Sequence, residues 1–157
     1  MTWLEWLAAT PPAMLLQRSG TAYLLVNAAH IAFLGTLAGA IVALDLRLLG
    51  MGRQVPLASA GPFLSRIAAT GLGLAVLTGA WLFTTQPDTY LDNAAFLAKL
   101  GLVGAAVLNA LCLHARPAWQ AVLRPGATVP ASLRLQAAVS LLLWLSVIVA
   151  GRWIGFL

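Results

Sequence analysis

Two histidines lie inside stretches of the chain that are otherwise apolar. His30 lies in the segment "YLLVNAAHIAFLGTLAGAIVALDLRLLG", with Asn27 three residues before it, and His114 ends the run "LNALCLH". Neutral imidazole is a common ligand of haem iron and of transition-metal ions. Ionisable groups in a membrane segment are costly and are often functional. Haem or metal binding by His30 and His114 is therefore the first chemistry to consider.

The segments that position these histidines are typical of a membrane protein. The chain has 157 residues, of which 61% are hydrophobic and 8% charged, whereas soluble domains carry about 25% charged residues. A membrane-crossing helix needs about 20 mostly apolar residues, and four stretches qualify. They lie at approximately residues 21–49, 64–85, 95–115 and 133–153. We predict an all-α fold, an integral membrane four-helix bundle formed by residues 21–157.

Residues 1–20 are predicted to form a separate N-terminal interfacial segment. Thr2 and Glu5 have the spacing of a capping box, which predicts a helix start. Trp3 and Trp6 give this short helix an apolar side, which suits a helix lying along the membrane surface.

The basic residues predict how the bundle is oriented. Six lie in or beside the loops after the first and third spans, and three lie on the opposite side. The six are Arg47, Arg53, Arg66, Arg116, Arg124 and Arg134. The positive-inside rule then predicts a multi-pass membrane protein with those two loops in the cytoplasm and both termini on the outer side. Because these residues stand singly, the net charge of +5 does not indicate a nucleic-acid partner.

Stripes of small residues predict which helix faces pack closely. The first span carries the stripe Ala28, Ala32, Gly35, Gly39 and Ala43, and the second carries Gly71, Ala75 and Gly79. At about 100° per residue, His30 projects almost opposite the first stripe and shares its face with Asn27 and Tyr23. We expect that polar face to meet another helix, a ligand or a partner protein.

Each histidine has two interpretations. His30 is either a haem or metal ligand, or a residue hydrogen-bonded to Asn27, Tyr23 or a serine of the fourth span. His114 is either the second axial ligand or an interface residue beside Arg116. By the helical rise, His114 lies about 8 Å deeper than His30, so a shared iron requires tilted helices.

The other polar residues are expected to have mainly structural roles. Asp45 is expected to pair with Arg47 or Arg66, and Lys99 is expected to reach the outer surface. Arg66 or Arg152 would meet a haem propionate or an anionic lipid headgroup. The chain has no GxSxG, HExxH or P-loop motif and only four acids, so no catalytic residue is predicted.

Several quoted runs also carry a family resemblance. They are "AHIAFLGTLAGAIVALDLRLLG", "GLAVLTGAWLF", "NAAFLAKLGLVGAAVLNALCLH" and "AAVSLLLWLSVIVAGRWIGFL". Together they resemble a bacterial family of small four-helix inner-membrane proteins with a domain of unknown function. In overall plan the chain is similar to the copper resistance protein D family and to cytochrome-b-type membrane bundles. The latter similarity implies haem b, for which this chain can supply at most one bis-histidine pair.

Two functions follow as hypotheses. In the first, the protein is an electron-transfer subunit that binds haem b or a metal through His30 and His114, between a periplasmic donor and the quinone pool. In the second, it is a non-catalytic anchor or assembly subunit, or a copper-handling membrane protein. Either is a redox or structural subunit rather than a stand-alone enzyme. The expected partners are membrane lipid, a quinone, and another membrane or periplasmic protein or a second copy of the chain.

Overall fold

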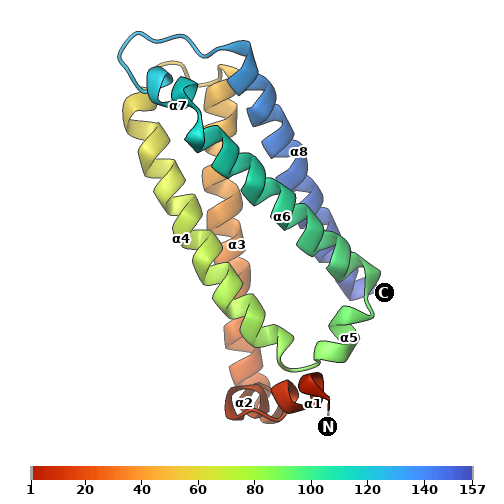
Figure 1. Cartoon of the computed structure of the whole chain (residues 1–157). Helices are drawn as coiled ribbons and strands as arrows, with labels where there is room; N and C mark the ends of the chain where they lie inside the picture. The colour runs from red at the N-terminus through yellow and green to blue at the C-terminus, as the bar shows by residue number, and fades with distance from the viewer. Residues whose placement is uncertain (1, 157) are drawn as a thin grey trace.

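Every regular element in the part of the chain that the structure describes is helical. The computed structural model describes residues 2–156. The elements are α1 (Trp3–Ala8), α2 (Pro11–Arg18), α3 (Gly20–Leu49), α4 (Leu57–Phe83), α5 (Pro87–Leu91), α6 (Ala94–Ala115), α7 (Pro117–Val122), α8 (Ala131–Trp153) and the 3-10 turn η1 (Ile154–Phe156) (Figure 1). The helices α3, α4, α6 and α8 are long and apolar enough to cross a membrane. The predicted all-α four-helix membrane bundle is confirmed.

The predicted spans agree with the helices except at the start of α4. This helix begins at Leu57, seven residues before the predicted start at residue 64, and it contains Pro62. The Gly61–Pro62 pair is typical of a helix break, but here it lies in the second turn. Gly61 is buried against Trp119 and Leu123, so packing holds this turn helical.

The two ends of the bundle differ in charge. Both chain termini lie with α1, α2 and α5 at one end, and α7 lies at the other (Figure 1). We call the first the acidic end, because Glu5, Asp88 and Asp92 lie there, and the second the basic end, because it holds the arginines of the loops flanking α7 and between α3 and α4.

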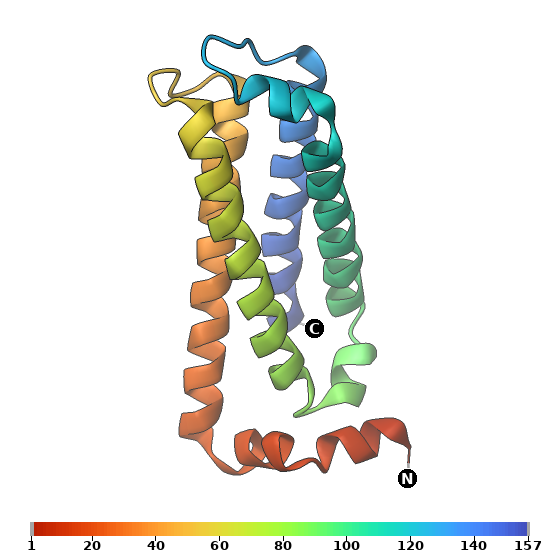
Figure 2. The ribbon, with the colours of Figure 1, turned by 60° about the vertical axis from the view of Figure 1, so that its left-hand side comes forward.

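The N-terminal segment crosses the acidic end of the bundle (Figure 2). The predicted capping box is present, because the Glu5 amide donates to Thr2 Oγ1 at 3.2 Å and the Thr2 amide donates to Glu5 Oε2 at 2.9 Å. The segment forms two short helices rather than one, since α2 begins at Pro11. Proline lacks an amide hydrogen and therefore suits the first position of a helix.

The spans pack as two pairs. α3 packs most extensively on α4, α6 packs on α8, and the contact between α3 and α8 joins the pairs. A core at the basic end comprises Leu44, Leu48, Leu57, Leu113, Trp119, Val122, Leu133 and Ala137. A second, towards the middle, comprises Leu37, Ala106, Trp144 and Val147. The pairs are thus fastened together mainly at the basic end and in the middle.

The stripe of small residues on α3 does not form the close helix contact that the sequence predicts. All five of its residues are exposed, and at Gly35 and Gly39 an added Cβ would have no neighbour within 4 Å. The close approach comes instead from α4, where an added Cβ at Gly71 would lie 2.9 Å from the Leu37 amide nitrogen. One glycine stripe is sufficient, because it can receive the bulky face of the neighbouring helix.

Trp119 is buried at the basic end of the bundle. Its side chain is only 3% exposed. It packs over Gly61 and beside the His114 ring, whose centroid is 4.8 Å away. Trp119 therefore belongs to the core that closes the basic end.

Candidate functional site

The His30 ring is directed at α4. Its Nδ1 lies 2.9 Å from the Thr78 hydroxyl, and an added Cβ at Gly79 would lie 2.9 Å from its Cε1. The partner is thus a threonine of the second span, rather than Asn27, Tyr23 or a serine of the fourth span as expected. Gly79 leaves the room in which the imidazole lies against the helix.

The hydrogen bonds around Thr78 favour the tautomer of His30 that carries the proton on Nδ1. The Thr78 hydroxyl donates to the Leu74 carbonyl at 2.8 Å. A hydroxyl has one proton to donate, so its oxygen accepts from His30 Nδ1–H. The lone pair of Nε2 then remains for a ligand.

Lys99 of α6 acts on this site electrostatically. Its charge interacts with His30, and its side chain packs on α8, where Nζ lies 3.6 Å from an added Cβ at Gly151. Lys99 lies five residues after the start of α6, and Thr78 lies five residues before the end of α4. By the helical rise, both are about 8 Å from the acidic ends of their helices. We call His30, Thr78, Gly79 and Lys99 the acidic-end site.

Aromatic rings lie on the same helix faces, nearer the acidic end. Tyr90 of α5 lies 6.1 Å from Phe83 and 5.2 Å from Phe96 between ring centroids, and Phe83 stacks on Phe96 at 5.8 Å. Phe83 is one turn from Gly79, and Phe96 is three residues from Lys99. Burial raises the pKa of Tyr90 to about 12, and its hydrogen bond with Tyr23 adds to the effect. These rings form an apolar, flat-sided wall beside the site.

His114 lies at a different level of the bundle. Its Nε2 is 2.9 Å from the Ser65 hydroxyl of α4, and its Nδ1 is 2.8 Å from the Ala110 carbonyl. Ser65 and Thr78 are 13 positions apart on α4, or about 20 Å by the helical rise. The structure therefore does not bring His30 and His114 together, and they cannot ligate one iron atom in this arrangement. Both nitrogens of His114 are also occupied.

The other predicted ligand-contacting residues are dispersed. Asn27 is half-buried on the His30 face of α3, one turn from His30 towards the acidic end. Arg66 is exposed beside Ser65, far from His30 along α4. The Arg152 guanidinium lies 4.6 Å from the centroid of the Phe156 ring.

Asp45 does not form the expected ion pair. Its side chain is 4% exposed and is hydrogen-bonded by Ser140 of α8, while its Oδ2 has no hydrogen-bond partner. Arg47 donates instead to the Val55 carbonyl at 2.7 Å. The reason is geometric, since Asp45 faces α8 whereas Arg47 faces the loop that follows α3.

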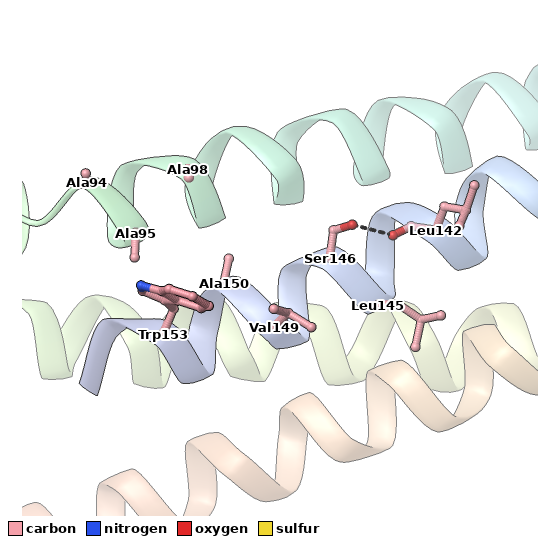
Figure 3. Close-up of a pocket in the computed structure, with 9 residues that line it drawn as sticks. All are labelled: Ala94, Ala95, Ala98, Leu142, Leu145, Ser146, Val149, Ala150 and Trp153. Carbon is pink, nitrogen blue, oxygen red and sulfur yellow. Dashed lines mark hydrogen bonds between the residues drawn. The ribbon is translucent and has the colours of Figure 1, made fainter. Parts of the chain in front are cut away.

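A groove with a volume of about 560 Å³ lies between α6 and α8. Ala94, Ala98, Leu142 and Trp153 are among its lining residues (Figure 3). Ser146 also lines it, but its hydroxyl donates to the Leu142 carbonyl of its own helix at 2.8 Å. The groove thus offers apolar surface rather than reactive groups.

The donor set limits the chemistry. Within residues 2–156 there is no cluster of three or more His, Cys, Asp or Glu side chains that could hold a metal ion. The acidic-end site offers one imidazole lone pair, one ammonium and an aromatic wall. This set can bind a flat polar ring through hydrogen bonds and stacking.

Sequence reasoning identified His30 but not its partners. Thr78 lies one residue before Gly79 of the predicted small stripe, so its place on an interhelical face was readable from the spacing. The interaction of Lys99 with His30 was not readable from the sequence, because it depends on how the α6–α8 pair docks on the α3–α4 pair.

Comparison with known proteins assigns the chain to a family. Residues 4–157 match the family described as a family of unknown function, DUF6644, and the chain belongs to it. No curated protein and no solved structure matches the chain.

Proposed function

We propose that this member of the DUF6644 family is a redox subunit of the bacterial inner membrane that binds the head group of a membrane quinone at the acidic-end site. Electrons would pass there between a periplasmic donor and the quinone pool. The observation that supports the proposal is the electrostatic interaction of Lys99 on α6 with His30 on α3, together with the stacking of Phe83 on Phe96.

The two polar groups suit both redox forms of a quinone. An ammonium has only donors, so Lys99 would donate to a quinone carbonyl. His30 Nε2 carries a lone pair, so it would accept from a quinol hydroxyl and is suited to take up its proton. Thr78 would act as a positioning residue, because its hydrogen bond with Nδ1 fixes the tautomer.

The depth of the site also supports a quinone. A site about 8 Å from the helix ends is reached from the apolar layer, where the quinone tail resides. The excess of arginines at the opposite end favours a cytoplasmic basic end. The acidic-end site would then lie in the periplasmic half of the membrane, close to a periplasmic donor.

Haem b fits these residues less well. A bis-histidine haem is not proposed, because His30 and His114 contact α4 about 20 Å apart. A haem held by His30 Nε2 alone is the version that remains. It predicts a Soret band in the purified protein, whereas a quinone site without haem predicts none.

The proposal is tested by the quinone that co-purifies with the full chain in lipid nanodiscs. His30→Asn retains an N–H that can reach Thr78 but lacks Nε2, and Lys99→Met retains the length of the side chain but lacks the charge. Both variants should lose most of the bound quinone. Ser65→Ala, which alters the other histidine's surroundings, should retain it. Equal quinone content in all four proteins, or none in the wild type even after quinone is added, would refute the proposal.

A second function is favoured by the exposed stripe on α3. A glycine-containing stripe without a partner helix suits contact with another membrane helix, as expected of an anchor or assembly subunit. Replacing Gly39 with Ile should then release a co-purifying partner or second copy, without changing the stability of the single chain.

A further inference from the structure

A cavity at the basic end of the bundle is independent of the acidic-end site. It lies between the loop that joins α3 to α4 and the loop that joins α7 to α8, and its volume is about 460 Å³. This is within the range of about 300–1,000 Å³ that is usual for small-molecule sites. Four arginines line it: Arg47, Arg53, Arg124 and Arg134.

The charges of these arginines are not neutralised by the protein. No carboxylate lines the cavity. Of the four acids in the chain, three lie at the acidic end, and Asp45 is buried against Ser140. Four guanidinium groups around one small space repel each other unless an anion lies between them.

Two of the arginines are held in place by the loop. Arg47 Nε donates to the Val55 carbonyl at 2.7 Å, and Arg53 Nε donates to the Gly50 carbonyl at 3.2 Å. Gly50 ends α3 with a φ of 108°, a left-handed conformation that favours glycine. A guanidinium has five N–H donors, so both groups retain donors for a ligand while their positions are fixed.

The start of α4 adds to the positive potential. Leu57 and Ala58 line the cavity, and the N-cap residue Pro56 offers no side-chain hydrogen bond to the first amides of this 27-residue helix. Unpaired amides and the helix dipole both favour an anion at this position.

We propose that this cavity binds a phosphate group, either the phosphodiester of an anionic phospholipid or a soluble phosphate. Guanidinium groups bind phosphate oxygens in pairs of hydrogen bonds. The cavity lies where the spans α3, α4 and α8 end, which is the level of the lipid headgroups. Basic pockets at such positions recognise anionic headgroups. The inference does not depend on quinone binding.

The test compares two double variants of the full chain with equal loss of charge. Arg124→Gln with Arg134→Gln removes the two cavity arginines that do not hold the α3–α4 loop. Arg66→Gln with Arg116→Gln removes two exposed arginines of the same end that lie outside the cavity. Binding is measured by native mass spectrometry and by thermal shift in detergent, with cardiolipin, phosphatidylcholine or inorganic phosphate as the added probe.

We expect cardiolipin to bind the wild type and the Arg66/Arg116 variant alike, and to bind the Arg124/Arg134 variant at least tenfold more weakly. Saturable stabilisation by inorganic phosphate without lipid, lost in the same variant, would support the site but assign it to a soluble phosphate. Equal weakening in both double variants, or binding of phosphatidylcholine as strong as that of cardiolipin, would overturn the proposal. A circular dichroism spectrum and an elution volume equal to those of the wild type show that each variant is folded.

Discussion

The contact of Gly71 with α3 permits a quantitative prediction. Replacing Gly71 with Ala adds a methyl group that would lie 2.9 Å from the Leu37 amide nitrogen and 3.1 Å from the Phe33 carbonyl oxygen. Both atoms belong to the backbone, so α3 and α4 must separate. Overpacking of this kind costs about 1–3 kcal/mol, whereas alanine in a helix gains about 0.5–1 kcal/mol over glycine. The net expectation is a loss of about 0–2.5 kcal/mol in the free energy of unfolding, centred on about 1 kcal/mol.

Gly73→Ala is the matched control. Gly73 lies on the same helix two residues away, is exposed, and has nothing within 4 Å of an added Cβ. Its replacement should therefore gain about 0.5–1 kcal/mol, and the difference between the two variants isolates the clash. Unfolding by SDS in mixed micelles, followed by the far-UV circular dichroism signal, gives both values. If Gly71→Ala is as stable as Gly73→Ala, α3 and α4 do not approach each other through Gly71, and the close packing of these two helices is wrong.

Three further predictions concern other parts of the bundle. Ser65→Ala removes the hydrogen bond to His114. It should lower the free energy of unfolding by about 0.6 kcal/mol, measured by the same SDS titration. No change would mean that this bond does not join α4 to α6. Asp45→Asn keeps a group that can bond Ser140 but removes a charge that has no cationic partner. The free energy of unfolding should therefore stay the same or rise. A fall of more than about 1 kcal/mol would contradict the buried, unpaired placement of Asp45. Tyr90 has a pKa of about 12 in the folded protein against about 10 in an unfolded chain. The stabilisation by its neutral phenol is therefore complete below pH 10 and is lost as the pH rises towards 12. Tyr90→Phe should flatten the decline of the unfolding temperature over that range. Parallel declines in the wild type and the variant would contradict this prediction.

The membrane bundle was predictable because its signals are local. Apolar runs of sufficient length define α3, α6 and α8 to within two residues, and the Thr2–Glu5 capping box defines the start of α1. The start of α4 was predicted seven residues late, since Gly61–Pro62 indicates a break unless the neighbouring Trp119 is known to pack over it.

The faces of the helices were harder to predict than the helices. Two stripes of small residues satisfy the same sequence rule, but only the one on α4 is used within the chain, and the one on α3 is exposed. Which stripe is used depends on the docking of α8 against α3. A single sequence contains no direct signal for that contact.

The candidate site was predicted in part. His30 was identified because a histidine in an apolar helix is unusual, and the depth mismatch with His114 already argued against a shared iron. Thr78 of the second span contacts His30 and Lys99 of the third span interacts with it electrostatically, and such interactions between distant segments follow from tertiary packing alone. The expected pairing of Asp45 with Arg47 or Arg66 was wrong for the same reason.

The central claim is that a quinone head group binds between the two helix pairs, against His30 and Lys99. Photolabelling of the full chain in nanodiscs with an azido-quinone, followed by peptide mapping, locates the head group directly. We expect the label on the segments of α3 around His30 and of α6 around Lys99, with protection by an excess of unlabelled quinone. Label confined to the groove between α6 and α8, or spread over the lipid-facing surface without protection, would contradict the claim.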